Sequence, residues 1–198
     1  MSVVDRQPLV LATRNPHKLR EFARLLAPAG IAIEPLPDEV ELPTEDGDTF
    51  AENALPKARA AAAATGRPAI ADDSGIEAEA LGGAPGVRSA RYAGVGASDR
   101  ENLDKLVREA PTGSALRYVC ALVYVDPVAG EWRLFEGESR GRMAKAPRGS
   151  GGFGYDPIFQ IGDGRTMAEM SESEKDAISH RGRAARLMAE WLATGSRR

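Results

Sequence analysis

The alternation of short apolar runs with segments of helical periodicity is the feature that most restricts the fold of this chain. Residues 8–13 read as a buried strand, and a polar turn leads into a helix over 18–26, where apolar residues recur at helical spacing. Residues 31–36 read as a second strand and 69–71 as a short third one. This alternation is typical of α/β proteins.

The middle of the chain has a different pattern. Residues 115–125 and 131–139 are rich in strand-forming side chains, and the segment 126–130 supplies a turn, which predicts a β-hairpin. Glycines and a proline over 81–96 indicate a long loop, and a short strand is expected over 158–161. Because a hairpin is antiparallel, we expect an α/β fold with a mixed central sheet flanked by helices.

Helix starts are marked along the chain by capping residues. Two segments, 49–52 and 171–174, match the capping-box pattern, and the first opens an alanine-rich helix that reaches about Thr65. A final helix is expected to start near Ser179. Pro56 lies inside the alanine-rich helix, so we expect a kink or a break in its first turns, because proline removes a backbone donor.

Composition limits the class of partner and the compartment. A chain of 198 residues suffices for one substantial domain, 1–198, and its net charge of −3 argues against nucleic-acid binding. The only cysteine, Cys120, lies in an apolar run, which favours a buried thiol and a reducing, cytoplasmic location. Residues 1–6 lack a signal-peptide core, no apolar run could span a membrane, and the tail 195–198 is expected to fray.

The turn between the first strand and the first helix is a candidate anion site. It contains Thr13, Arg14, Asn15, Pro16, His17 and Lys18. A helix N-terminus offers free N–H groups and a positive dipole, to which Asn15 adds an amide and Lys18 a charge. These groups fit a triphosphate, although a plain helix cap with a solvated lysine is the alternative. The glycine spacing of a Walker P-loop is absent.

Two adjacent carboxylates, Asp72 and Asp73, follow the third strand. Since neighbouring strand residues point to opposite faces, one can face a ligand while the other anchors a turn. Carboxylates at a strand end suit Mg²⁺, which takes one or two protein oxygens plus substrate phosphate. An Asx turn before Ser74 is the alternative. Glu45, in an acidic loop, offers a further metal-binding oxygen or is simply a solvated acid.

A glycine-rich run interrupted by aromatic residues spans 149–157. Glycines let a backbone approach a ligand closely, Phe153 can stack on a flat ring, and Asp156 can accept hydrogen bonds. A tight turn with core aromatics is the alternative. His180 and Arg181 stand where the last helix should start, and cations there oppose the helix dipole unless a bound nucleotide compensates. Exposed residues in a polar turn are the alternative for this pair.

Taken together, these segments resemble the inosine/xanthosine triphosphate pyrophosphatases. The resemblance rests on residues 11–18 (LATRNPHK), 49–54 (TFAENA), 71–75 (ADDSG), 82–92 (GGAPGVRSARY), 152–159 (GFGYDPIF) and 174–182 (EKDAISHRG). It implies a two-lobed α/β fold with a long central sheet, a cleft between the lobes, and a homodimer. It also implies Mg²⁺-dependent hydrolysis of dITP, ITP and XTP to the monophosphate and pyrophosphate, which keeps these bases out of DNA and RNA.

The resemblance implies roles for individual residues as well. Asp73 matches an acid assigned as proton acceptor and metal-associated group, and Glu45 matches a metal-binding acid. Lys57 matches a second phosphate-binding lysine beside the turn 13–18, and Ser74 an adjacent substrate contact. The base pocket matches Phe153, Gly154, Tyr155, Asp156, Lys175, His180 and Arg181. The chain departs from the family pattern at Arg14 and His17, where glycines are frequent, and at Pro56.

Two other functions remain open at this point. One is a related pyrophosphatase that acts on modified pyrimidine or ordinary nucleotides. The other is a non-catalytic nucleotide sensor, against which the acids Asp72, Asp73 and Glu45 argue, because binding alone does not need them. In each case the partner is a small nucleotide, and neither nucleic acid nor a membrane is expected.

Overall fold

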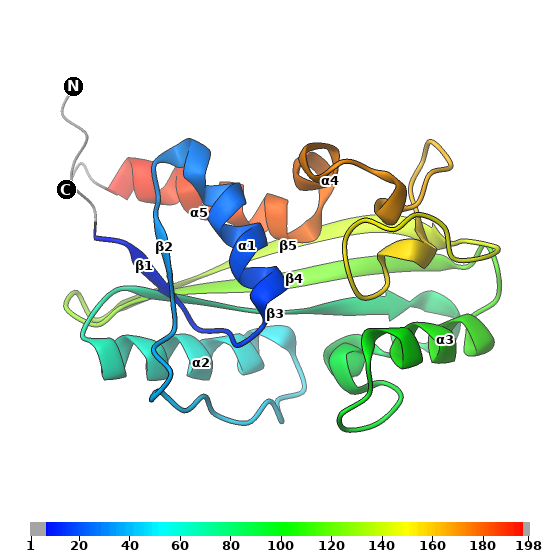
Figure 1. Ribbon diagram of the computed structural model, residues 1–198. Coiled ribbons are helices and arrows are strands. Elements are labelled where there is room, and N and C mark those ends of the chain that lie inside the picture. The colour runs from blue at the N-terminus through cyan, green and yellow to red at the C-terminus, as the bar shows by residue number, and fades with distance from the viewer. Residues whose placement is uncertain (1–6, 196–198) are drawn as a thin grey trace. The chain divides into compact units, whose positions relative to one another are not determined.

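A computed structural model describes residues 7–195, whose strands and helices are labelled in Figure 1. The strands are β1 (Leu9–Leu11), β2 (Ile33–Pro35), β3 (Ala69–Ala78), β4 (Ala115–Asp126), β5 (Glu131–Met143) and β6 (Phe159–Gln160). The helices are α1 (Pro16–Leu26), α2 (Phe50–Thr65), α3 (Asp99–Glu109), α4 (Glu172–Ile178) and α5 (His180–Gly195). Residues 1–6, where no signal peptide is expected, and residues 196–198 of the tail expected to fray lie outside the described residues.

Within residues 7–195 the sheet has six strands in the order β2-β1-β3-β4-β5-β6. β1 runs parallel to β2 and β3, whereas β5 and β6 are antiparallel, so the predicted mixed α/β sheet is confirmed. Leu11, the last residue of β1, pairs with Ile70 of β3. β3 therefore continues past the carboxyl end of β1, an edge where α/β sheets commonly bind ligands.

The described chain divides into two compact units. The first comprises residues 7–73, 121–136 and 184–195, and the second comprises 74–120 and 137–183. In the first unit, α2 lies on one side of the strands and α1 and α5 lie on the other (Figure 1). In the second unit, α3 and α4 lie on opposite sides of the strands.

The core of the first unit depends on small side chains. Its buried residues are Val10, Ala12, Leu36, Ala54, Ala58, Ala61, Ala62, Ala69, Ala71, Val123 and Val125. The alanine face of α2 lets this helix pack closely on the strands. The predicted break at Pro56 is wrong, because α2 runs without interruption over Phe50–Thr65. Pro56 is exposed, so water can hydrate the carbonyl that loses its helical donor.

The second unit has a larger-residue core. It contains Ile76, Ala78, Leu103, Leu106, Ala110, Leu116, Tyr118, Met143, Tyr155, Ile158, Phe159 and Met167. Cys120 of β4 is 0% exposed, which confirms the predicted buried strand cysteine. The predicted loop over 81–96 is interrupted by a 3₁₀ turn at Gly86–Arg91. Among the described residues, no helix is long and apolar enough to cross a membrane.

Candidate functional site

Asp72 and Asp73 lie inside β3, so the predicted strand end at residue 71 and the alternative Asx turn are both wrong. Their side chains point to opposite faces, as predicted. Asp72 Oδ2 lies 3.0 Å from Lys18 Nζ of α1, and Asp73 Oδ2 accepts a 2.9 Å hydrogen bond from Asn53 Nδ2 of α2. Both carboxylates therefore stand beyond the carboxyl end of β1, each held by a side chain from a different helix.

The carboxyl group of Asp73 is held in a mostly buried position, with 6% of the residue exposed. Burial raises the pKa of Asp73 above its ordinary value, and the charge of Glu45 acts in the same direction. The charge of Lys57 and the hydrogen bond from Asn53 lower it, with a smaller contribution from Lys18. A carboxyl with a raised pKa in such a cluster suits a proton acceptor or a metal ligand.

Asn53 belongs to this group of residues, although the sequence reading did not single it out. Its Oδ1 accepts a 2.8 Å hydrogen bond from the backbone N–H of Gly47, which leaves Nδ2 directed at Asp73. A Cβ at Gly47 would lie 2.7 Å from Glu52 Cβ, so the acidic loop needs glycine here. Asn53 precedes Lys57 by one helical turn, and that spacing is the signal that could have identified it.

Lys57 is buried, and its ammonium group contacts oxygen atoms of the loop that contains Glu45 and of strand β3. Nζ donates to the Glu45 carboxylate and, at 2.9 Å, to the Asp72 carbonyl oxygen. Within residues 7–195, no cluster of three or more His, Cys, Asp or Glu side chains could hold a metal. Glu45 and Asp73 nevertheless interact electrostatically. This pair fits Mg²⁺, which commonly takes one or two carboxylates and keeps its remaining positions for water and substrate oxygens.

The turn 13–18 forms a helix cap. Asn15 Oδ1 accepts hydrogen bonds from the backbone N–H groups of His17 and Lys18, at 2.8 and 3.3 Å. Pro16 occupies the first turn of α1, and Thr13 Oγ1 accepts from the N–H of Asn15 at 3.2 Å. The expectation of free N–H groups is therefore wrong for His17 and Lys18. An anion bound here would depend mainly on the Lys18 ammonium group and the Asn15 amide.

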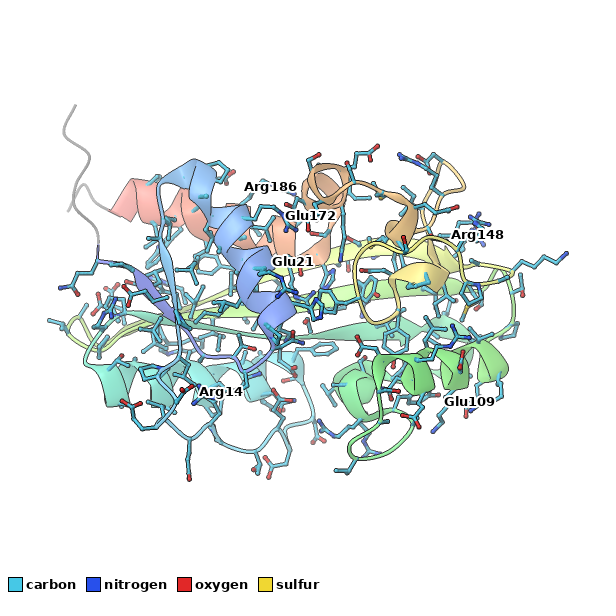
Figure 2. The ribbon with its side chains drawn as sticks, viewed as in Figure 1. Arg14, Glu21, Glu109, Arg148, Glu172 and Arg186 are labelled. Atoms are coloured by element: carbon cyan, nitrogen blue, oxygen red, sulfur yellow. The ribbon has the colours of Figure 1, made fainter. Side chains whose placement is uncertain are left out.

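Arg14 holds the turn to the loop after β2 (Figure 2). Its guanidinium group donates to the backbone carbonyl oxygens of Leu36, Pro37, Asp38 and Val40, at 2.6 to 3.1 Å. His17 also contacts its own chain, since its Nδ1 lies 3.0 Å from Arg20 Nη2. Arg14 and His17, which stand where glycines are frequent in the resembling family, thus each contact other parts of the chain. Substrate contact by either side chain stays a prediction.

Replacing Arg14 with methionine should destabilise the first unit. The variant keeps an unbranched apolar stem but loses the hydrogen bonds to the loop, and we expect a loss of about 1–2 kcal/mol in the free energy of unfolding. Urea denaturation measures this loss. Arg14→Lys should not restore stability, because one ammonium group cannot reproduce the guanidinium fork. Arg100→Met, which removes only an exposed pair with Asp104, is the control, and an equal loss there would contradict this role.

The predicted base-pocket residues of the second unit are connected through Asp156. This carboxylate is 2% exposed, and its Oδ2 accepts hydrogen bonds from Lys175 Nζ at 2.7 Å and from the N–H of Phe153 at 2.9 Å. Lys175 Nζ and Arg181 Cζ lie 5.0 and 5.1 Å from the centre of the Phe153 ring. Two cations thus contact one partly exposed aromatic ring.

His180 and Arg181 are buried at the start of α5, so the alternative of exposed residues in a polar turn is wrong. Arg181 Nη2 donates to Ser74 Oγ at 2.7 Å. The His180 ring lies parallel to the ring of Tyr118, with centroids 4.6 Å apart and an interplanar angle of 6°. Tyr118 was not among the predicted site residues, because its place in an apolar strand pattern marked it only as core.

The glycine-rich run is explained largely by contacts within the chain. At Gly149 and Gly152 φ is positive, and added Cβ atoms would lie 2.3 Å from the backbone of Ala168 and 2.0 Å from Asp156 Oδ2. Contacts within the chain are therefore sufficient to explain why glycine occupies these two positions, and close approach to a ligand stays a prediction. The ring of Tyr155 is buried in the core, and its hydroxyl donates to the carbonyl of Ser89 at 2.7 Å.

Gly154, by contrast, has open space where a Cβ would lie, although its φ of 62° favours glycine. Its N–H donates to Asp99 Oδ2 at 3.0 Å. Among the aromatic side chains of the run, Phe153 is the partly exposed one, whereas Tyr155 is buried. Phe153 is therefore the ring of this run that can stack on a ligand.

Sequence comparison identifies close relatives of this chain. The Ham1 family pattern matches residues 9–191. A protein of Symbiobacterium thermophilum named dITP/XTP pyrophosphatase is 53% identical over 185 residues, which cover 91% of this chain and 92% of the relative. A protein of the same name from Erwinia tasmaniensis is 50% identical over 201 residues, covering 98% of each chain.

Solved structures agree with the sequence comparison. A HAM1 protein from Coxiella burnetii superimposes with a TM-score of 0.85 and 40% identity, covering 94% of this chain and 98% of that one. A nucleoside-triphosphatase, also titled dITP/XTP pyrophosphatase, from Mycobacterium abscessus gives a TM-score of 0.70 and 40% identity, with 92% and 98% coverage.

Proposed function

Because this chain belongs to the Ham1 family, we propose that it is a pyrophosphatase that hydrolyses dITP, ITP and XTP to the monophosphate and pyrophosphate. Relatives at 53 and 50% identity are named dITP/XTP pyrophosphatase and match almost their full length. The structural observation that carries the proposal is the grouping of Asp73, Asn53, Lys57 and Glu45 beyond the carboxyl end of β1. Removal of these nucleotides from the pool would keep their bases out of DNA and RNA.

The first unit supplies the groups that hydrolysis of a triphosphate needs. The reaction requires a water molecule directed at the α-phosphorus, a proton acceptor, and neutralisation of phosphate charge. Asp73, whose pKa is raised by burial, is the proton acceptor in this proposal. Lys18 and Lys57 neutralise phosphate charge. Glu45 and Asp73 would hold Mg²⁺, which supplies further charge neutralisation at the phosphate oxygens.

The second unit supplies the selectivity for the base. Lys175, His180 and Arg181 provide donors that can face the 6-oxo group of hypoxanthine or xanthine. Adenine carries an amino group at that position, so donors would face donors and the complex would lose hydrogen bonds. Phe153 provides the stacking surface, and Asp156 fixes Lys175 and the backbone of Phe153.

We also propose a homodimer in a reducing, cytoplasmic compartment. The family resemblance supports the dimer, and the single cysteine, buried in β4, supports the compartment. Sedimentation at micromolar protein concentration tests the oligomeric state directly.

A panel of nucleoside triphosphates with product identification tests the proposed reaction. We expect pyrophosphate from dITP and XTP in the presence of Mg²⁺, with kcat/KM about 100-fold or more above that for dATP, because the pocket's donors reject the 6-amino group. Release of orthophosphate alone would exclude cleavage between the α- and β-phosphates. Fastest turnover of a pyrimidine nucleotide would favour the related pyrophosphatase, and calorimetric binding without turnover would favour a sensor.

A further inference from the structure

Tyr118 of β4 contacts two of the base-pocket residues while remaining almost inaccessible itself, with 6% of the residue exposed. Its ring lies parallel to that of His180, at 4.6 Å and 6°. The same ring stacks with Phe159 of β6, whose centroid is also 4.6 Å away, at 29°. Phe159 is fully buried. The Tyr118 ring is thus anchored in the core of the second unit and presents a fixed plane to the imidazole.

The hydroxyl group of Tyr118 provides a second contact. It lies 3.3 Å from Asp156 Oδ1, whereas Lys175 and the N–H of Phe153 bind the other oxygen, Oδ2. The Asp156 carboxylate is therefore held at both oxygens. Burial, with a smaller contribution from the Asp156 charge, holds the pKa of Tyr118 well above its ordinary value. The phenol is therefore neutral at neutral pH and can donate its hydroxyl proton.

The contacts of Tyr118 with His180 and Asp156 indicate how it can influence which base the pocket accepts. Discrimination between similar bases depends on donors and acceptors that are held within a fraction of an ångström of their working positions. We propose that Tyr118 is a positioning residue that determines the selectivity of the base pocket by fixing the plane of His180 and the Oδ1 atom of Asp156. This inference rests on the proposed function. Tyr118 acts through these neighbours, because its own ring is enclosed by the core.

Two substitutions separate the contacts of Tyr118. Tyr118→Phe keeps the ring stack and removes the hydroxyl, whereas Tyr118→Leu removes both. Tyr124→Phe is the matched control, since Tyr124 lies on the same strand with 7% exposure but packs edge-on against Trp191. The measurement is kcat/KM for dITP and for dGTP, which shares the 6-oxo group and differs at the 2-position.

The ratio of kcat/KM for dITP to that for dGTP is the decisive quantity. We expect the ratio to fall about tenfold in Tyr118→Leu, because a loosened pocket no longer rejects the competing base. In Tyr118→Phe we expect a fall of about threefold, the cost of one hydrogen bond. The control should keep the wild-type ratio. A residue needed only for stability would lower the melting temperature or the active fraction and leave the ratio unchanged.

An unchanged ratio in folded Tyr118→Leu would overturn the proposal. If that variant does not fold, as judged by circular dichroism, Tyr118→Phe decides, and a wild-type ratio there is equally contradictory. Failure of the proposed function is a separate result, since the wild-type protein would then release no pyrophosphate from dITP. Wild-type turnover with unchanged selectivity in the variants overturns the role of Tyr118 alone.

Discussion

Replacing Asp73 with asparagine should remove most dITP hydrolysis, lowering kcat by about 10²–10⁴-fold, the usual contribution of a general base. Asparagine keeps the size of the side chain and can still accept a hydrogen bond from Asn53, so the fold should be retained. It cannot accept a proton from water, and it is a poor ligand for Mg²⁺. Steady-state release of pyrophosphate measures the loss, and near-normal turnover would exclude Asp73 as the catalytic base.

The same substitution should stabilise the protein at neutral pH when Mg²⁺ is absent. Burial raises the pKa of Asp73 above the ordinary value of 3.8. Between the ordinary pKa, which applies to the unfolded state, and the raised pKa of the native state, the native state binds more protons than the unfolded state. The stability of the protein therefore falls as pH rises through the native pKa. Above that pKa the buried charge destabilises the protein, and asparagine removes the charge. The gain in melting temperature should shrink as pH falls towards the ordinary value.

Asp104→Asn is the matched control for both measurements. Asp104 is an aspartate on the surface of α3 that pairs with Arg100 at 2.9 Å. Exposed pairs of this kind contribute little, so turnover and melting temperature should both stay close to wild type. Melting curves are recorded with EDTA, because a bound cation would compensate the charge of Asp73. A lower melting temperature for Asp73→Asn than for the control would contradict the burial argument.

Lys175→Met should cause the largest loss of stability. Lys175 and Asp156 form a buried ion pair at 2.7 Å, and removal of the lysine leaves the carboxylate without its cation. Removing one partner of a buried pair typically costs about 3–5 kcal/mol. Urea denaturation monitored by circular dichroism measures the loss. The KM for dITP should rise as well, because Lys175 also contacts the Phe153 ring.

A second substitution tests whether the uncompensated charge is the cause. The double variant Lys175→Met/Asp156→Asn has no buried carboxylate at this position, so it should be more stable than Lys175→Met alone. Arg165→Met removes an arginine that pairs with Asp163 and Glu174 on the surface, and it should cost less than about 1 kcal/mol. A double variant no more stable than the single one would mean that lost packing, and not charge, causes the effect.

The elements predicted correctly are those whose signal lies within a few residues. The capping box at Thr49 and Glu52 places the start of α2 correctly, because both of its reciprocal hydrogen bonds are local. The capping box at 171–174 likewise opens α4. The mixed sheet follows from one parallel segment and one hairpin pattern, which are also local features. Local chemistry is therefore sufficient for these parts of the fold.

β3 shows where local reasoning fails. The sequence Asp72-Asp73-Ser74-Gly75 has the composition of a turn, and residues of this kind are rare in strands. The strand nevertheless continues to Ala78, because Lys18 and Asn53 from two helices contact the carboxylates on its two faces. Those partners lie far away in the sequence, so no local pattern could show that the charges would be satisfied.

Arg14 and Gly152 make contacts within the chain that residue type alone does not show. Arg14 stands in a turn that suits phosphate, yet its guanidinium group binds carbonyl oxygens 22 to 26 residues further along. Gly152 stands in a run that suits a ligand, yet the atom that excludes its side chain belongs to Asp156. Residue type alone therefore indicates candidate site residues, and the structure is needed to show which of them make supporting contacts within the chain.

Because Cys120 is buried, the rate at which its thiol reacts with a reagent measures how often β4 is transiently exposed. It is the only thiol in the chain, and it lies in β4 with no accessible surface. A thiol-reactive dye can therefore label the native protein only when this strand is transiently exposed, and at high dye concentration the labelling rate becomes the opening rate. Ligands that bind the closed state should slow that labelling in proportion to their occupancy, which gives a binding assay without an engineered probe.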